Sequence, residues 1–221
     1  GRLSHHIADG ANLLFLEGAK YTGIFPVWDW RMIPGTTVEQ TTDLPSSVKA
    51  MGETDFVGGV SDGQYGMAAF DLKRGALQAR KAWFFFDAGY VCLGAGGTCD
   101  SPHSVMTTID QRLADGATEL VLNSGAKEKH DSIGEPRNVS NALWMVHDGV
   151  AWGMIDGSTA RLTHAAQRGN WRRINSSLSD RVVEENVFKL WIDHGASPKN
   201  AKYAYEVRPG LQVDDLGDSK P

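Results

Sequence analysis

Two-residue turns that contain glycine occur along most of this chain, and they constrain its fold more than any other feature. Each turn lies between stretches whose apolar residues alternate or run continuously, as in β-hairpins. Glycine suits such turns because it adopts the positive φ that they require. The six candidates are Glu17-Gly18, Arg74-Gly75, Ala88-Gly89, Asp115-Gly116, Asp148-Gly149 and Asp156-Gly157.

The rest of the pattern agrees with an all-β chain, because no window of helical length keeps apolar residues at i, i+3 and i+4. Hairpins without helical crossovers predict a large antiparallel β-sandwich of several sheets. Three polar stretches, 39–53, 126–137 and 167–180, are too long for tight turns and are predicted to be surface loops. Strands are predicted at residues 11–16, 55–60, 65–73, 76–86, 90–95, 105–112, 119–123, 141–147, 150–155, 161–167, 187–193 and 202–207.

The stretch 81–87, Lys-Ala-Trp-Phe-Phe-Phe-Asp, is apolar at consecutive positions. Since successive side chains of a strand point to opposite faces, this pattern predicts a strand covered on both sides. It places Trp83 in the core.

Composition excludes several classes of protein. A net charge of −5 argues against general nucleic-acid binding, which needs a basic face. No apolar run approaches the roughly 20 residues of a membrane-spanning helix. The two cysteines, Cys92 and Cys99, leave two alternatives open: a disulfide across a loop or, as we favour, two free thiols.

The stretch 21–37 places two tryptophans around Asp29 and continues into a Pro-Gly turn. In one interpretation an indole seals the core and Asp29 accepts backbone hydrogen bonds that hold the loop. In the other, an indole faces a sugar ring or a partner domain, and Arg31 pairs with an acidic group of the ligand. The substrate-binding residues predicted from this stretch are Trp28, Arg31, Thr36 and Thr37.

The histidines give no convincing metal-binding spacing, and no metal or cofactor is predicted. His5 and His6 are adjacent, and we expect polar residues of the terminus or surface. His194 follows an apolar strand at a turn, where we expect a hydrogen-bonded structural residue.

Five blocks resemble, in the same order, the central β-sandwich domain of family 8 polysaccharide lyases, which include hyaluronate, chondroitin and xanthan lyases. The resemblance extends from near residue 8 to residue 209. The blocks are Ile-Phe-Pro-Val-Trp-Asp-Trp (24–30) with Ile-Pro-Gly-Thr-Thr (33–37), Phe-Val-Gly-Gly-Val-Ser-Asp-Gly (56–63), Ala-Arg-Lys-Ala-Trp-Phe-Phe-Phe (79–86), Cys-Leu-Gly (92–94) and Lys-Asn-Ala-Lys-Tyr-Ala-Tyr (199–205).

This resemblance implies a central "supersandwich" that lies between an N-terminal α/α toroid and a small C-terminal β domain. In the family, a Tyr/His pair and an Asn of the toroid carry out β-elimination at a uronic acid, assisted by an Arg. The family's central domain adds a glutamate that would fall at or just before residue 1. No catalytic residue is therefore assigned in this chain.

The expected domain covers residues 1–209, and residues 210–221 are predicted to form a linker towards the C-terminal domain. The expected partners are an acidic polysaccharide and the two other domains, and the expected location is secreted or periplasmic. The alternatives are a stand-alone carbohydrate-binding β-sandwich without catalytic activity and a purely structural spacer.

Overall fold

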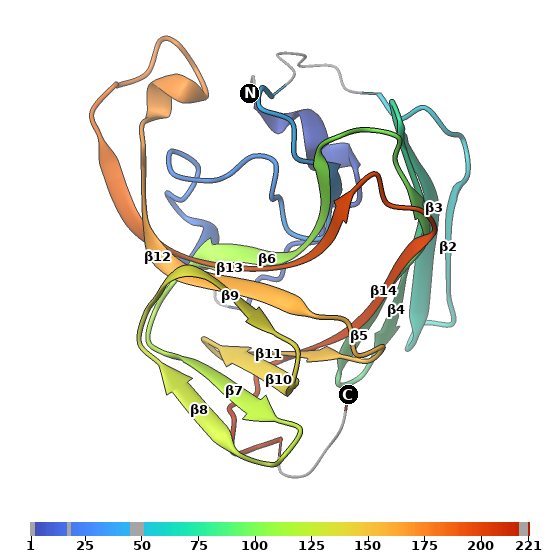
Figure 1. The fold of residues 1–221 in the computed structure, drawn as a ribbon, viewed down its shortest axis with the longest axis vertical. Helices are drawn as coiled ribbons and strands as arrows, with labels where there is room; N and C mark the ends of the chain where they lie inside the picture. Colours follow the sequence, from blue (N-terminus) through green and yellow to red (C-terminus); the bar gives the residue numbers. More distant parts are fainter. Residues whose placement is uncertain (1–2, 17–18, 45–50, 217–220) are drawn as a thin grey trace.

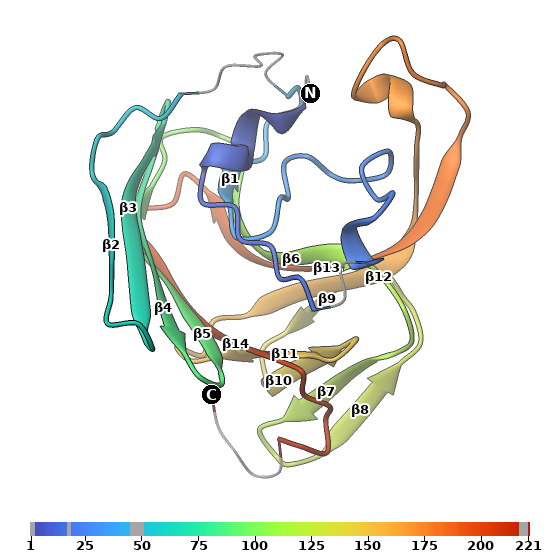
Figure 2. The ribbon, with the colours of Figure 1, turned by 180° about the vertical axis from the view of Figure 1, so that it is seen from behind.

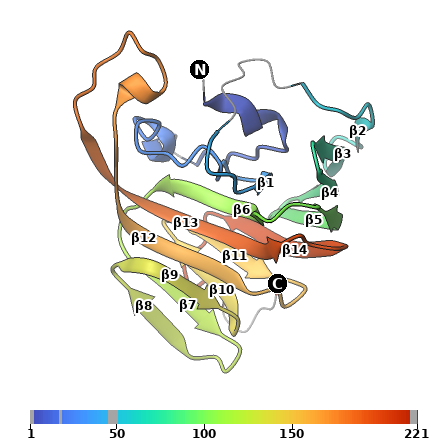
Figure 3. The same cartoon turned by 45° about the horizontal axis from the view of Figure 1, so that its top comes forward.

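The computed structural model describes residues 3–16, 19–44, 51–216 and 221. Its strands form two sheets in which all paired strands are antiparallel. The predicted large antiparallel β-sandwich is confirmed (Figures 1 and 3).

The smaller sheet has five strands, in the order β1 (Thr37–Glu39), β6 (Ser104–Leu113), β13 (Val183–Ala196), β12 (Ala160–Gly169) and β9 (Ile133–Val139). The larger sheet has nine, in the order β2 (Val57–Ser61), β3 (Gly66–Arg74), β4 (Leu77–Phe86), β5 (Gly89–Thr98), β14 (Ala201–Pro209), β11 (Val150–Met154), β10 (Ala142–His147), β7 (Thr118–Leu122) and β8 (Lys127–His130). The described helices are short 3₁₀ turns: η1 (Ser4–Ala8), η2 (Ala19–Tyr21) and η3 (Trp171–Arg173).

The main core lies between the two sheets. Trp152 of β11 stacks on Phe188 of β13 at a ring distance of 5.3 Å, so the largest side chains meet across the sandwich. Each such aromatic residue buries roughly 150–250 Å². This contact joins strands that are distant in the sequence and holds the two layers together.

The segment before β1 covers the other face of the smaller sheet. Ile24, Trp28 and Ile33 pack there against Val187 of β13 in a second apolar cluster. Figure 2 shows this segment, in blue, over β6 and β13 on the side away from β10 and β11. The strand predicted at residues 11–16 is wrong, because this part of the segment is irregular and its Asn12 N–H donates to the Pro34 carbonyl at 2.8 Å.

Three of the predicted turns close hairpins as expected: Arg74-Gly75, Ala88-Gly89 and Asp148-Gly149. At the last turn both residues have positive φ, 54° and 72°, as a type I′ turn requires.

Two other predicted hairpins are wrong. Asp115-Gly116 connects β6 to β7 and Asp156-Gly157 connects β11 to β12, and each pair of strands belongs to different sheets. Glycine permits the sharp turn, but the side on which the next strand packs is decided by the core. The candidate Glu17-Gly18 lies outside the described residues.

The loop predicted at 126–137 is also wrong, because it contains β8 and most of β9. Both are exposed edge strands with charged side chains and therefore lack an apolar pattern. The short strand β1 was likewise not predicted. Its last residue, Glu39, begins the polar stretch 39–53, and residues 45–50 of that stretch lie outside the described residues. In the stretch 167–180, the residues after β12 form the predicted loop, which includes η3.

The strand predicted to be covered on both sides is β4, and this expectation is wrong. Trp83 and Phe84 are only half-buried, and Phe85 and Phe86 are exposed, whereas Lys81 is buried. The inner face of β4 is covered only in part, by the segment that contains Gly10. Cys92 and Cys99 are buried free thiols, as favoured.

Candidate functional site

The tryptophans of the stretch 21–37 are buried. Trp28 is 3% exposed and Trp30 7%, and their ring centroids lie 5.4 Å apart. Phe25 stacks on Trp28 at 5.1 Å and keeps some exposed surface. The structure thus favours the structural interpretation, in which these indoles seal a cluster over the smaller sheet.

Gln111 of β6 holds the stretch 21–37, here called the tryptophan loop, in place. Its side-chain oxygen accepts from the Asp29 N–H at 2.9 Å, and its nitrogen donates to the carbonyls of Asp29 and Met32 at 3.0 and 2.8 Å. The Asp29 carboxylate accepts the N–H of Arg31 at 3.1 Å, which confirms the backbone role expected of it. These bonds satisfy backbone groups that have no ladder partner.

Arg31 keeps the most accessible side chain of the four predicted binding residues, 32% exposed. Its Nε lies 3.3 Å from Asp29 Oδ1, and its Nη1 donates to the Thr41 carbonyl at 2.9 Å. Part of its fork of donors therefore holds the loop, and the remainder faces the surface.

Thr36 and Thr37 are buried, at 0% and 3% exposure. The Thr36 hydroxyl donates to the Ile33 carbonyl at 2.7 Å, and the Thr37 hydroxyl pairs with that of Thr107 at 2.9 Å. Like Trp28, they offer almost no surface to a glycan, so direct binding by these three residues has no support in the structure. Thr107 also pairs with His194 at 2.8 Å, the hydrogen-bonded histidine that was expected.

The Pro-Gly turn brings this loop against the N-terminal segment. Gly35 has φ 84°, and a Cβ there would lie 2.4 Å from the Cβ of Asn12 and 2.6 Å from the Gly10 carbonyl oxygen. Only glycine fits both the backbone conformation and this close approach. The turn therefore places residues 9–12 beside β1.

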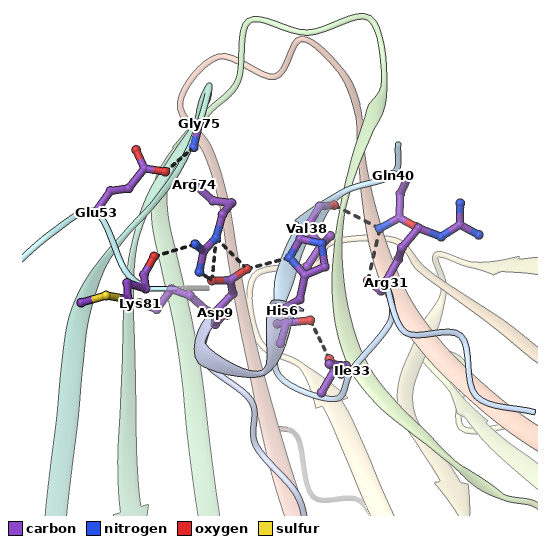
Figure 4. Close-up of polar contacts among 12 residues, drawn as sticks. His6, Asp9, Arg31, Ile33, Val38, Gln40, Glu53, Arg74, Gly75 and Lys81 are labelled. Atoms are coloured by element: carbon purple, nitrogen blue, oxygen red, sulfur yellow. Dashed lines mark hydrogen bonds and ion pairs between the residues drawn. The ribbon is translucent and has the colours of Figure 1, made fainter. Parts of the chain in front are cut away.

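A charged cluster formed by His6, Asp9 and Arg74 lies at this junction; His6 and Asp9 are buried and Arg74 is partly buried (Figure 4). His6 Nδ1 is 2.7 Å from Asp9 Oδ2, and Arg74 Nε is 3.2 Å from Asp9 Oδ1. Burial by itself would raise the pKa of Asp9, but hydrogen bonds from His6 and Arg74 lower it below its usual value. The expectation of a terminal or surface position is wrong for His6, which is 6% exposed.

Lys81 of β4 lies next to this cluster and is almost fully buried. Its ammonium donates to the carbonyls of Asp9, at 3.2 Å, and Gly35, and it lies 5.7 Å from the centre of the Trp83 ring. Burial lowers the pKa of Lys81 to about 7. Lys81 thus ties the N-terminal segment and the Pro-Gly turn to the larger sheet.

Beside the cluster is a cavity of about 240 Å³, lined by His5, His6, Asp9, Thr37, Val38, Glu39, Thr41, Arg74, Gly75 and Leu77. Around this cavity, His6, Asp9 and Arg74 are paired with one another, and Glu39 accepts a hydrogen bond from Ser101. The lining offers no evident nucleophile. No group of three or more His, Cys, Asp or Glu side chains that could hold a metal ion occurs among the described residues.

Local sequence patterns do not predict this cluster. One signal was available: Lys81 interrupts the apolar inward-facing positions of β4, Leu77, Ala79 and Trp83. Nothing in the sequence indicates that Asp9 and Arg74, 65 positions apart, form an ion pair.

Comparisons with known proteins agree with the fold of this chain. The sequence model of the super-sandwich domain of polysaccharide lyase family 8 matches residues 1–220. Chondroitinase-AC of Pedobacter heparinus is 42% identical over 213 residues, which cover 95% of this chain and 30% of that protein. Xanthan lyase of Bacillus sp. strain GL1 is 33% identical over 222 residues, 94% of this chain and 24% of that enzyme.

A solved structure of chondroitinase AC lyase superimposes with a TM-score of 0.86 and 39% identity, covering 95% of this chain and 31% of that one. The chain therefore spans less than a third of the length of these relatives.

Proposed function

The chain belongs to polysaccharide lyase family 8, and we propose that it acts as the central domain of a lyase that cleaves uronate-containing glycans by β-elimination. The observation that carries this proposal is the match of the super-sandwich model to residues 1–220. Relatives named chondroitinase-AC and xanthan lyase support an acidic polysaccharide as the substrate class.

The chemistry of the reaction explains why this domain needs partner domains. Removal of the weakly acidic proton at C5 of a uronic acid requires a positioned base together with neutralisation of the neighbouring carboxylate. The charged groups of the His6–Asp9–Arg74 cluster are paired with one another and do not form such a set. An α/α toroid of the same enzyme is the proposed source of the catalytic groups, and a small C-terminal β domain is its other proposed partner.

Arg31 is the residue through which this domain would contact the glycan or the toroid. It is partly exposed, it lies in the tryptophan loop, and its guanidinium can donate to a carboxylate or a sulfate. The rigid loop beneath it, held by Gln111 and Asp29, would position the guanidinium with little loss of conformational entropy.

An enzyme that degrades extracellular polysaccharides would be secreted or periplasmic, and this is the location we propose. Among the described residues, the structure has no helix long and apolar enough to cross a membrane.

The test is to compare the 221-residue chain with the complete polypeptide of its reading frame on hyaluronan, chondroitin and xanthan. We expect unsaturated uronate absorbance only with the complete polypeptide. Activity of the short chain above a buffer control would contradict the division of labour. Glycan binding by a complete polypeptide that lacks lyase activity would instead favour a non-catalytic binding module.

A further inference from the structure

Strand β2 forms one edge of the nine-stranded sheet and, among the described residues, pairs only with β3 (Figure 1). All five of its residues are exposed, and Val57 is 78% exposed. An edge strand of this kind presents unpaired N–H and C=O groups that can pair with another chain.

The hydrogen bonds at both ends of β2 identify which groups are free. The Asp71 N–H donates to the Phe56 carbonyl at 3.1 Å, and the Asp62 N–H donates to the Tyr65 carbonyl at 3.3 Å. Hydrogen-bonded pairs alternate in an antiparallel ladder, so even-numbered residues of β2 bond to β3. The backbone groups of Val57, Gly59 and Ser61 therefore point away from the sheet.

The other edges of the two sheets carry features that discourage pairing, whereas β2 has none of them. At the opposite edge of its sheet, β8 consists of Lys-Glu-Lys-His. In the smaller sheet, β9 contains Pro136 between charged residues, and β1 is three residues long. The sequence of β2 is Val-Gly-Gly-Val-Ser, without a charge, a proline or a bulge. Natural proteins protect exposed edges by such features, so an unprotected edge indicates a partner.

The surroundings of β2 are apolar. Phe56, Val60, Tyr65 and Phe86 are exposed near it, and the rings of Tyr65 and Phe86 lie 6.2 Å apart. Phe85 is exposed on the opposite face of the sheet, in line with Ser61 of β2. A shallow hollow at the β2–β3 end could hold a partner side chain; it is lined by Gly59, Val60, Ser61, Gln64, Tyr65, Gly66, Met67 and Phe85. Clustered exposed apolar residues of this kind mark interaction surfaces.

Charge at the two ends of β2 selects the kind of partner. Asp55 precedes the strand, and Asp62 follows it. Because the outward-facing backbone groups belong to odd-numbered residues, a second antiparallel copy would have to pair odd-numbered with odd-numbered residues, and Asp55 would not lie opposite Asp62. Opposite charges placed across a ladder are stabilising, so the two carboxylates favour a partner segment with basic residues at these positions.

We propose that the outer edge of β2 binds an extended polypeptide segment with an apolar centre and a Lys or Arg opposite Asp55 and Asp62. The segment belongs to a part of the same lyase outside this chain, which spans about 30% of the length of chondroitinase-AC. Taking the partner from the same polypeptide rests on the proposed function. Covalent linkage would raise the effective concentration of such a segment and make a short added strand sufficient.

Hydrogen exchange tests the proposal on the unchanged proteins. We expect the amides of Val57 and Gly59 to exchange rapidly in the 221-residue chain and at least roughly 100-fold more slowly in the complete polypeptide, as for other protected strands. Equal, rapid exchange in both would overturn the proposal. Protection that appears in the short chain together with dimerisation would also overturn it, in favour of a second copy.

Two substitutions separate backbone pairing from side-chain packing. Val57→Pro removes an outward N–H without removing a bond to β3, whereas Val57→Thr keeps the N–H and the branched side chain. We expect Val57→Pro alone to abolish protection of Gly59 in the complete polypeptide while leaving the Tm of the short chain within about 2 °C of wild type. Protection retained in Val57→Pro would contradict the proposal.

The readouts of the two proposals are independent. Lyase activity with an unprotected β2 edge would refute the strand pairing and leave the proposed function standing. A protected β2 edge in a polypeptide without lyase activity would support the strand pairing and refute the proposed function.

Discussion

At the scale of single residues, the structure gives its clearest physical roles to two cations, Lys81 and Arg31. Lys81 lies almost fully buried and donates to two backbone carbonyls, from Asp9 and from Gly35. A buried ammonium is costly because it loses its hydration. Its two hydrogen bonds offset part of this cost and join three separate segments of the chain.

We predict that Lys81 makes stability depend on pH above neutrality. Burial lowers the pKa of Lys81 to about 7 in the folded protein, from 10.5. Between these values the unfolded chain binds more protons, so stability rises with pH, by at most about 1.4 kcal/mol per pH unit. Urea unfolding of wild type and Lys81→Met between pH 7 and 8.5 should show this slope only in wild type. The exposed-site variant Lys202→Met should keep it, and an unchanged slope in Lys81→Met would refute the prediction.

For Arg31, we predict an effect on both stability and kinetics. Arg31→Ala removes contacts with Asp29 and the Thr41 carbonyl, which should lower the free energy of unfolding by about 1 kcal/mol. If the exposed part of the guanidinium contacts the glycan or the toroid, kcat/KM of the complete enzyme should fall at least roughly tenfold, or about 1.4 kcal/mol. Unchanged kinetics together with lower stability would make Arg31 a purely structural residue.

At the scale of elements, two histidines connect the sheets. His147 of β10 and His164 of β12 have ring centroids 5.4 Å apart, and His147 also stacks on Phe188 at 4.4 Å. Buried nitrogens of both rings, Nε2 of His147 and Nδ1 of His164, have no hydrogen-bond partner in the part of the chain that the structure describes. Protonation of either ring would therefore place an unpaired charge between the layers.

We predict that His147 lowers stability in mild acid. Burial, and secondarily His164, lowers the pKa of His147 from 6.5 to about 4. Between pH 6.5 and 4 the unfolded chain binds the additional proton, so stability falls as pH falls. Thermal unfolding at pH 7 and pH 5 should show a smaller loss for His147→Phe than for wild type. His103→Phe, in the loop before β6, serves as the control and should behave like wild type.

At the scale of the whole molecule, the core is centred between the sheets near β11 and β13, and not at β4. Trp152 is 1% exposed and packs against the Phe188 ring and the guanidinium of Arg112, which are neighbours in the smaller sheet. Trp83 is half-buried and stacks on Phe70 at 5.8 Å.

These positions predict different costs of truncation. Trp152→Ala should cost roughly 3–5 kcal/mol in the free energy of unfolding, whereas Trp83→Ala, which leaves a partly open site, should cost about half as much or less. Chemical denaturation of both variants checks this ranking. The reverse order would mean that β4 contributes more to the core than its exposure indicates.

The sequence by itself determined the strand content, several hairpins and the family, because these depend on local patterns. Alternation of side chains follows from the period of a strand, and Asp148-Gly149 closes a hairpin because its two residues accept positive φ. The backbone role of Asp29 was also predictable, since an Asp side chain readily accepts nearby backbone N–H groups.

Only the tertiary structure decided which turns pass from one sheet to the other, as at Asp115-Gly116 and Asp156-Gly157. It also decided that Trp28 is buried and that Phe85 is exposed. The His6–Asp9–Arg74 cluster and Lys81 depend on contacts between segments that are far apart in the sequence. Local patterns describe which face of a strand is apolar, but what covers that face depends on the packing of distant elements, and this determines burial and charge pairing.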